Sequence, residues 1–266
     1  MLPARGRASS SLGDTILELA PQAIDATRLA EYQRLCGFGV SDRLPLTYPH
    51  VLAFPLSLTR MVAADFPFPV IGLVHVHNLI TQSRPLTLAD EFSLSVEASE
   101  LRTHPRGVQV DIVSRARLAS GERVWSSRST YLRRDGSRHG ARPSDADDLG
   151  PPAAVIRVPA DIGRRYAAIS GDRNPIHLSA LTARAFGFPR AIGHGMWLAA
   201  RALATIEARL PSACAYDVAF RAPVLLPSTV ALHTAVDGDD WTVDVSDPHA
   251  GRRHMAASVT ASDSCN

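Results

Sequence analysis

The chain has 266 residues, of which 45% are hydrophobic and 20% charged, and its formal net charge is +2. This is the composition of a globular protein large enough for two small domains. A charge so close to zero argues against nucleic acid or a membrane surface as a partner. The chain has three cysteines that lie far apart in the sequence: Cys36, Cys214 and Cys265. This number and spacing exclude a disulfide framework and a CxxC metal site, and they favour a reducing, cytoplasmic compartment.

The first half of the chain is expected to form one helix followed by strands. Pro49 to Ala64 is the helical candidate, and Pro55 should kink or interrupt it because proline lacks a backbone N–H and clashes with the preceding turn. Four segments of strand-like composition follow. They are Leu73 to Gln82, Glu91 to Leu101, Gly107 to Leu118 and Arg123 to Arg133.

A polar segment then divides the chain into two halves of similar size. Residues 135–152 have the sequence DGSRHGARPSDADDLGPP, rich in Gly, Pro, Ser and Asp. A segment with so few apolar side chains cannot bury enough surface to form a packed element. We therefore predict a linker over 135–152, an N-terminal unit over 14–134 and a C-terminal unit over 153–266.

The second half repeats this order of elements. A short helical turn is expected over Arg164 to Ile169 and a long helix over Ala191 to Leu210, where apolar side chains recur at helical spacing and Pro211 marks the end. Because few of its side chains before Glu207 are polar, the long helix should be buried nearly all round. Strand-like segments follow at Tyr216 to Val224, Thr229 to Val236, Trp241 to Val245 and His254 to Ala261.

Each half is thus predicted to be one long central helix followed by an antiparallel meander. A sheet wrapped around one buried helix is the hot-dog arrangement, so we predict an α+β double hot-dog fold. A helix followed by strands is a common order, and a chance likeness of the two halves is the alternative. The agreement in the order and spacing of several elements favours a repeat.

The most informative segment is Tyr166 to His177, with the sequence YAAISGDRNPIH. Gly171 can adopt the positive φ that ends a helix. Asp172 to Pro175 is then a turn, because Asx side chains bond their own backbone and proline fixes φ. Such a loop is rigid, and it can bring Asp172 and His177 to one point although they are five residues apart.

Asp172 and His177 are the residue types that hydration of a conjugated double bond requires. One water molecule must be held and deprotonated, and a proton must reach the adjacent carbon. A carboxylate and an imidazole that share one water can do both, because histidine titrates near neutral pH. In an ordinary turn, however, such an Asp only caps the loop and such a His is only hydrogen-bonded, so a structural role is the alternative.

The segment Gly193-His194-Gly195-Met196 should open the long helix of the second half. Helix N-termini present unpaired N–H groups and the positive end of the helix dipole. Gly195 lets a ligand approach the backbone closely, so its N–H is a candidate donor to a developing oxyanion. His194 is expected to be structural rather than catalytic.

These segments resemble the MaoC-like hydratases, also called (R)-specific enoyl-CoA hydratases or hydratase 2. The family motif is approximately Y-x-x-x-S-G-D-x-N-P-[IL]-H, and residues 166–177 match every specified position. The segment that begins at Gly193 also matches, as does, more weakly, Phe220 to Val224. The close resemblance covers roughly residues 155–265, and the whole chain resembles the double hot-dog members, in which one repeat keeps the chemistry.

The resemblance implies an activity and roles for individual residues. Asp172 and His177 would activate water, Asn174 and Ser170 would support the loop, and the Gly195 N–H would bind the thioester carbonyl. The enzyme would interconvert trans-2-enoyl and (3R)-3-hydroxyacyl thioesters of coenzyme A or acyl carrier protein, with no metal or organic cofactor. The N-terminal unit would be a degenerate repeat that shapes an acyl tunnel. Since one chain already holds both repeats, we expect a monomer or a homodimer.

The first half holds one comparable polar cluster, formed by His75, His77 and Asn78 on a predicted strand. His75 and His77 should share one face, as residues i and i+2 of a strand do. A metal site would need a third ligand at a definable place, and none is evident, so we expect no metal. Arg165 and Arg190 are candidates for the phosphates of coenzyme A, although exposed arginines are usually only solvated.

Two other classes of function stay open. Hot-dog thioesterases use an acidic residue on or near the central helix and usually lack the SGDxNPxH segment; release of free thiol would identify one. A non-catalytic acyl-thioester-binding subunit would bind its ligand without turnover. The complete motif favours the hydratase/dehydratase.

Overall fold

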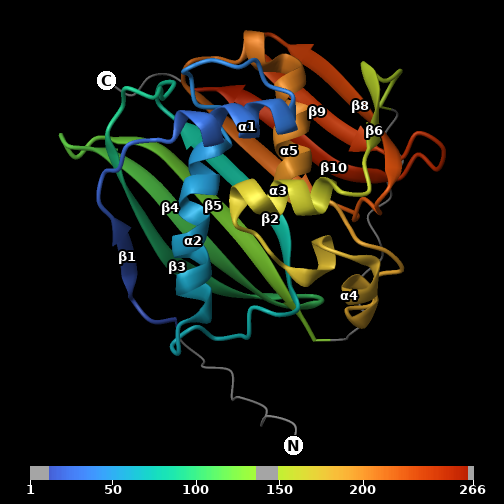
Figure 1. Ribbon diagram of the computed structural model, residues 1–266, viewed down its shortest axis with the longest axis horizontal. Coiled ribbons are helices and arrows are strands. Elements are labelled where there is room, and N and C mark those ends of the chain that lie inside the picture. Colours follow the sequence, from blue (N-terminus) through green and yellow to red (C-terminus); the bar gives the residue numbers. More distant parts are fainter. Residues whose placement is uncertain (1–11, 136–148, 263–266) are drawn as a thin grey trace, which may run out of the picture.

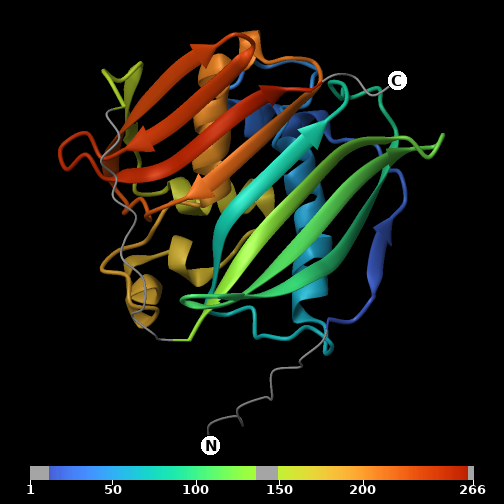
Figure 2. The ribbon, with the colours of Figure 1, turned by 180° about the vertical axis from the view of Figure 1, so that it is seen from behind.

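The structure, a computed structural model, describes residues 12–135 and 149–262. In these residues ten strands form one sheet in the order β1-β3-β4-β5-β2-β7-β10-β9-β8-β6, and neighbouring strands are antiparallel. The helices lie in front of the sheet in Figure 1, and the strands face the viewer in Figure 2. Most of the predicted linker, residues 136–148, lies outside the described part of the chain.

The first half gives two helices and five strands within the described residues. The helices are α1 (Ala26–Cys36) and α2 (Tyr48–Val62). Helix α2 packs against the sheet, mainly on β3 and β4. The four strands predicted here are confirmed, with ends that differ by three residues or fewer. The strands are β1 (Ile16–Leu19), β2 (Leu73–Gln82), β3 (Phe92–His104), β4 (Gly107–Leu118) and β5 (Arg123–Arg134).

The second half has the same plan, with its long helix α5 (Gly195–Leu203) buried as predicted: seven of its nine residues are buried. Its other helical elements are α3 (Ile162–Ser170), the 3-10 turn η1 (Pro175–His177), α4 (Ala180–Ala185) and the 3-10 helix η2 (Ala204–Arg209). Its strands are β6 (Ala154–Val158), β7 (Cys214–Phe220), β8 (Ser228–Asp237), β9 (Asp240–Ser246) and β10 (Arg253–Ala261).

Each half is therefore an antiparallel sheet wrapped around one helix, α2 in the first and α5 in the second. This confirms the double hot-dog fold. Strands β2 and β7 join the two sheets edge to edge, with paired residues running from His77 and Ala219 to Gln82 and Cys214. The join makes one continuous sheet, and it places the two central helices on the same side of it, as Figure 1 shows.

The central helices differ from the prediction in detail. An interruption at Pro55 is wrong, because α2 is helical from Tyr48 to Val62. The second helix was predicted over Ala191 to Leu210, but it begins at Gly195 and ends at Leu203, where the 3-10 helix η2 continues the chain to Arg209. The N–H of Ile192 bonds the carbonyl oxygen of Ile176 instead, and this ties the chain before α5 to the predicted catalytic loop.

Strand β7 ends at Phe220, so the prediction of a strand through Val224 is wrong. The N–H groups of Arg221 and Ala222 both bond the carbonyl oxygen of His254, which bends the chain away from the regular ladder. The segment that resembles the family after Phe220 is therefore a turn at the border of the sheet.

The prediction that His75 and His77 share a face of β2 is also wrong. The pairing of β2 with β5 shifts register between these two residues, which is a β-bulge. The Nε2 of His77 lies 2.6 Å from the carboxylate of Asp217, on the outer side of the joined sheet. His75 faces the other way, into a cavity described below.

Helix α1 was not expected from the sequence, although both of its ends carry ordinary signals. The Asp25 carboxylate caps the first turn by accepting the N–H groups of Thr27 and Arg28. Gly37 closes the last turn with a φ of 83°, a conformation that glycine adopts without strain. This helix contacts α3 and α5, and so it supports the second half from the first.

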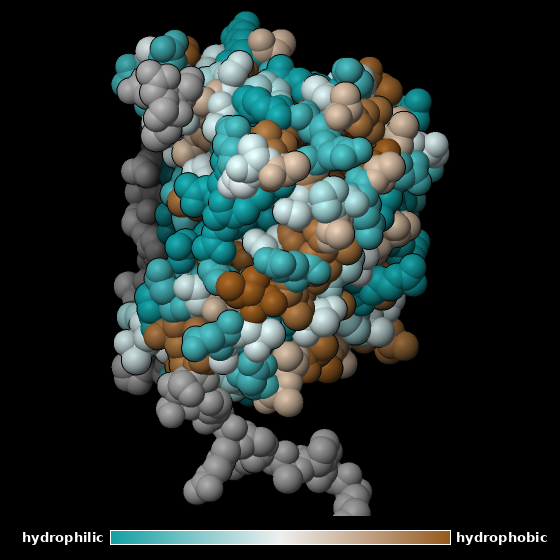
Figure 3. All heavy atoms as spheres, turned by 90° about the vertical axis from the view of Figure 1, so that its left-hand side faces the viewer, coloured by the Kyte–Doolittle hydropathy of each residue, from teal (hydrophilic) through white to brown (hydrophobic). Residues whose placement is uncertain are grey.

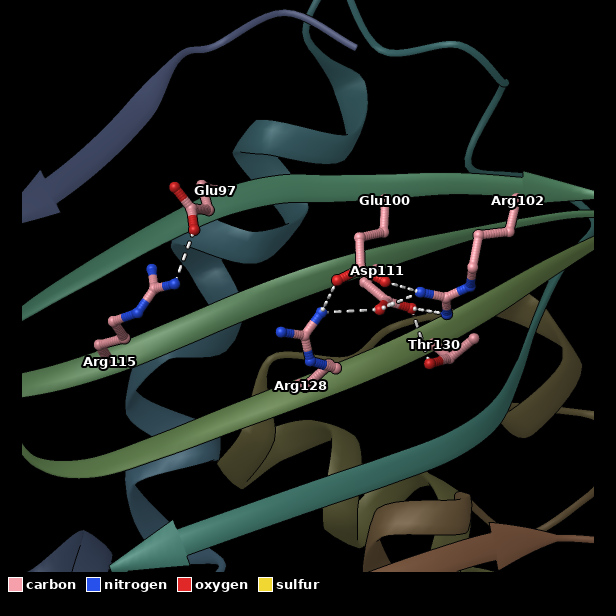
Figure 4. Close-up of polar contacts among 7 residues, drawn as sticks. All are labelled: Glu97, Glu100, Arg102, Asp111, Arg115, Arg128 and Thr130. Atoms are coloured by element: carbon pink, nitrogen blue, oxygen red, sulfur yellow. Dashed lines mark hydrogen bonds and ion pairs between the residues drawn. The ribbon is translucent and has the colours of Figure 1, made fainter. Parts of the chain in front are cut away.

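A charged network lies on the face of the first sheet that is turned away from α2 (Figure 4). Its centre is Asp111, a fully buried carboxylate. Asp111 accepts hydrogen bonds from Arg102 and Arg128, at 2.8 to 3.0 Å, and from Thr130 at 2.7 Å. Glu100 pairs with the same two arginines. Because these charges satisfy one another, we assign the network to the stability of the sheet.

Large exposed hydrophobic side chains are few, and Ile16 of β1 is one of them. On the face of the molecule that carries β1, hydrophobic spheres lie among hydrophilic ones (Figure 3).

No helix within residues 12–135 and 149–262 is long and apolar enough to cross a membrane.

Candidate active site

The loop after α3 carries the two predicted catalytic side chains and is braced by its own polar groups. Helix α3 ends at Ser170, and Gly171 closes it with a φ of 79°. The Oγ of Ser170 accepts the N–H of Asp172 at 3.2 Å, and the Oδ1 of Asp172 accepts the N–H of Asn174 at 3.1 Å. Asn174 in turn accepts the N–H of Ile176. These are the Asx bonds that the sequence indicates, and they fix the direction of the carboxylate.

His177 is held as a neutral base by one backbone contact. Its Nδ1 lies 2.8 Å from the carbonyl oxygen of Ile192. A carbonyl oxygen only accepts, so Nδ1 carries the proton and Nε2 of the neutral ring holds the lone pair. Burial lowers the pKa of His177, and the charge of Asp172 and the bond to Ile192 oppose that shift. The ring can therefore accept a proton at Nε2.

The Asp172 carboxylate lies beside this base. Burial raises the pKa of Asp172 above its ordinary value of 3.8, while His177 and the N–H of Asn174 act to lower it. Polar atoms of Asp172, His177 and His194 all lie within 4.8 Å of one another. Such a carboxylate and imidazole titrate as a pair, and together they can remove a proton from a bound molecule and return it elsewhere.

His194 fastens the loop to the start of α5. It is buried, and its Nε2 lies 3.0 Å from the backbone oxygen of Asp172. Burial holds the pKa of His194 well below its ordinary value, so the ring is neutral and its Nε2–H donates to that oxygen. These contacts agree with the structural role that the sequence suggests for His194.

A metal ion would fit this group of three residues poorly. The atom of His194 that approaches the Asp172 carboxylate, at 3.8 Å, is Nε2, whose N–H is already given to a carbonyl. Since a histidine must offer a lone pair to a metal, ligation through this atom would break the bond that holds the loop. The Nδ1–H of His177 is also given to a carbonyl, which leaves its Nε2 lone pair, so the group would offer a metal only two ligands, His177 Nε2 and the Asp172 carboxylate.

Gly195 is the first residue of α5, so its N–H belongs to the set that a helix leaves unpaired. It borders the same cavity as Asp172 and His177. A Cβ at this position would lie 2.9 Å from Cε1 of Phe220, which is too close for two carbon atoms. The glycine thus allows the Phe220 ring to lie against the start of the helix.

The cavity has a volume of about 640 Å³ and receives walls from both halves of the chain. This size lies within the usual range of roughly 300–1,000 Å³ for small-molecule sites. The second half gives Asp172, His177 and Gly195. The first half gives a largely apolar wall from α2, the segment before β2 and the first residue of β2: Val51, Phe54, Leu58, Met61, Val70 and Leu73.

Four exposed arginines border the cavity where it meets solvent: Arg106, Arg134, Arg173 and Arg221. The two arginines that the sequence suggested for phosphate binding, Arg165 and Arg190, do not line it. Arg190 instead donates to the carbonyl oxygen of Pro227.

Two further residues position the loop and were not found from the sequence. The Nε of Arg28 on α1 donates to the carbonyl oxygen of Ile169 at 3.0 Å, just before the loop. Gly163 of α3 lies against His177, so that a Cβ there would be 2.0 Å from the His177 carbonyl oxygen. A glycine inside a helix, such as Gly163, is a sequence signal of close packing. No sequence pattern indicates the contact between Arg28 and Ile169, which are 141 residues apart.

A double hot-dog fold with an Asp/His pair beside a helix N-terminus defines the class of protein, and the comparisons identify the family. The model of the "MaoC like domain" matches residues 147–256. The 3-hydroxyacyl-thioester dehydratase X of Mycobacterium tuberculosis is 40% identical over 241 residues, which are 89% of this chain and 85% of that protein. The chain belongs to the MaoC-like dehydratase family, and it is a hydro-lyase of the hydratase/dehydratase type.

Solved structures agree with this assignment. The crystal structure of HtdX of Mycobacterium tuberculosis matches with a TM-score of 0.83 and 37% identity, over 93% of this chain and all of that one. The 12:0-ACP thioesterase from Umbellularia californica matches with a TM-score of 0.57 and 11% identity, over 94% and 98% of the two chains. The second similarity shows only the shared fold, so the fold alone does not separate a hydratase from a thioesterase.

Proposed function

We propose that this protein interconverts trans-2-enoyl thioesters and (3R)-3-hydroxyacyl thioesters by activating water at Asp172 and His177. The observation that carries the proposal is the lone-pair Nε2 of His177 beside the Asp172 carboxylate, in a cavity that also holds the N–H of Gly195. The (3R) configuration rests on the match of residues 166–177 to the motif of the (R)-specific enzymes.

In the hydration direction, Asp172 and His177 hold one water molecule, and the pair takes its proton. The hydroxide oxygen forms a bond to C3 while the C2–C3 double bond breaks, and electron density moves onto the thioester oxygen. The Gly195 N–H, already oriented at the helix N-terminus, stabilises that oxygen. The pair then returns the proton to C2, so that one water is added in total. Dehydration follows the same steps in reverse.

The N-terminal unit over 14–134 is proposed as the wall of an acyl tunnel, and the unit over 153–266 as the catalytic repeat. Supporting this division, the apolar side of the cavity comes from α2 and the start of β2. The linker over 135–152 would join the two repeats. The proposal includes no metal and no organic cofactor, because the pair and the helix N-terminus provide the proton transfer and the oxyanion contact.

The carrier of the acyl chain is proposed to be coenzyme A or acyl carrier protein. Both present phosphate groups, and the four arginines at the opening of the cavity suit an anionic carrier. We propose a monomer or a homodimer in the cytoplasm, with no nucleic-acid partner. The alternatives, a hot-dog thioesterase and a non-catalytic acyl-thioester binder, leave the complete SGDxNPxH segment without a use.

The test is to mix purified protein with crotonyl-CoA or with a medium-chain trans-2-enoyl-CoA and to follow the enoyl-thioester absorbance. Loss of absorbance without release of free thiol, and a (3R) product on chiral analysis, would support the proposal. Free thiol would identify a thioesterase. Tight binding of the acyl-thioesters without any reaction, including with acyl carrier protein substrates, would identify a binding subunit.

A further inference from the structure

A group of polar side chains interrupts the apolar wall that the first half gives to the cavity. His50 of α2, His75 of β2 and Tyr131 of β5 all border the cavity. The rings of His75 and Tyr131 stack with their centroids 4.7 Å apart, and the rings of His50 and His75 are 6.3 Å apart. None of these side chains takes part in the proton transfer proposed for Asp172 and His177.

The β-bulge in β2 accounts for the direction of His75. Without the register shift, His75 would point to the outer face of the sheet together with His77, which binds Asp217 there. Bulges are over-represented beside active sites, where they re-aim a side chain. The backbone is thus shaped so that an imidazole borders the cavity together with its sequence neighbours Val74 and Val76.

Ring contacts place these imidazoles between the reaction centre and the apolar end of the cavity. Phe220 lies against Gly195, the proposed donor to the thioester carbonyl. The ring of His75 is 5.0 Å from that of Phe220, and the ring of His50 is 6.4 Å from that of Phe54. An acyl chain that starts at Gly195 and extends along α2 would therefore pass His75 and His50 before it reaches the apolar side chains.

Both imidazoles are neutral hydrogen-bonding groups. Burial lowers the pKa of His50 to about 4 and that of His75 to about 3. His50 Nδ1 lies 3.4 Å from Ser127 Oγ, whereas the buried Nε2 of His75 has no hydrogen-bond partner among residues 12–135 and 149–262. A plain alkyl chain would leave this nitrogen unsatisfied, and a neutral ring offers no charge to a carboxylate. The complementary group is a neutral oxygen.

We propose that the natural acyl chain carries a hydroxyl or ketone oxygen several carbons beyond the thioester, and that His75, assisted by His50, binds this oxygen. The inference rests on the proposed function, because it needs the acyl chain to enter from Gly195. His75 then determines specificity and takes no part in the proton transfer. A site built to bond a substrate oxygen discriminates strongly against the analogue that lacks it.

The experiment compares kcat/KM for (2E)-oct-2-enoyl-CoA with kcat/KM for its 5-hydroxy and 6-oxo derivatives. Crotonyl-CoA is the reference substrate, since its four-carbon chain ends beside the reaction centre. His75→Phe keeps a ring against Tyr131 and Phe220 but removes both nitrogens. His75→Gln keeps hydrogen-bonding atoms. His77→Phe is the matched control, because it changes the same residue type on the same strand outside the cavity.

The wild-type protein should prefer one oxygenated substrate over octenoyl-CoA by about tenfold or more. His75→Phe should abolish this preference, His75→Gln should restore part of it, and His77→Phe should keep both the preference and the wild-type turnover of crotonyl-CoA. His50→Phe should weaken it, which provides a second variant if His75→Phe fails to fold. A wild-type preference for octenoyl-CoA, or an unchanged preference in a folded His75→Phe protein, would overturn the proposal. Failure of the wild-type protein with all these thioesters, and with their acyl carrier protein counterparts, would instead overturn the proposed function itself.

Discussion

The imidazole rings of His177 and His194 stack with their centroids 3.7 Å apart and their planes inclined by 29°. Each ring gives one N–H to a backbone carbonyl, His177 to Ile192 and His194 to Asp172. Two imidazolium ions could not lie so close in a buried site, so the contact requires at least one neutral ring. The stack thereby joins the start of α5 to the loop after α3, the two segments that carry the proposed catalytic groups.

His194→Ala should lower kcat for hydration by about 10- to 100-fold with little change in KM, because the Asp172 backbone loses the bond that positions it. His194→Gln should retain more activity, since its amide can still donate to that carbonyl. Steady-state assays with crotonyl-CoA measure both variants. Wild-type kcat in His194→Ala would show that the bond does not position Asp172.

The pH profile of kcat/KM should have an acid limb whose midpoint lies above 3.8, the ordinary pKa of Asp. The active form needs an ionised Asp172 and a neutral His177. Burial raises the pKa of Asp172, so the carboxylate becomes protonated, and activity is lost, while the pH is still above 3.8. Burial lowers the pKa of His177, so this ring stays neutral at pH 6.5 and its protonation does not inhibit there. Assays at constant ionic strength measure the limb. A midpoint at or below 3.8 would contradict the raised pKa of Asp172.

Gly163→Ala should disturb the catalytic loop, because its Cβ would lie 2.0 Å from the carbonyl oxygen of His177. We expect hydration activity to fall by about 10²-fold, as a displacement of about 1 Å can cause. Gly39→Ala is the matched control, since its Cβ would approach nothing closer than 3.6 Å. Equal activities and thermal midpoints for the two variants would show that the loop accommodates the extra carbon.

Arg28→Ala should lower activity through the loop rather than through contact with substrate. Arg28 donates to the Ile169 carbonyl from the other half of the chain, and it does not line the cavity. We expect a decrease in kcat of several-fold to about tenfold and faster hydrogen exchange in residues 169–177. Arg34→Ala, on the same helix but exposed, should behave as wild type. Unchanged exchange in Arg28→Ala would contradict this role.

Much of the fold could be predicted because the signals are local. Apolar periodicity located the central helix of the second half, and strand composition located the four strands from Leu73 to Arg134. Helix α1 was missed although Asp25 and Gly37 mark its ends, because its middle is mostly polar. The strand predicted through Val224 failed for a different reason: two N–H groups after Phe220 bond to His254 on another strand, and no sequence pattern shows such a partner.

The candidate site also has a part that could be predicted from the sequence and a part that could not. The Asx bonds of Asp172 and Asn174 follow from the residue types of the loop itself. The cavity does not, because it is built where two halves of the chain meet, and its polar patch depends on a bulge that reverses the expected direction of His75. A bulge inserts one residue into a ladder, and alternation along a single strand cannot reveal it.

The measurement that tests the central claim most directly is the rate at which Asp172→Asn protein hydrates crotonyl-CoA, relative to wild type in the same absorbance assay. The amide keeps the shape of the carboxylate but cannot take a proton. We expect the rate to fall by about 10²- to 10⁴-fold. The thermal midpoint at neutral pH should be no lower than that of wild type, because burial disfavours the ionised carboxyl that the amide replaces. Turnover close to wild type in the folded Asp172→Asn protein would contradict the assignment of Asp172 to water activation.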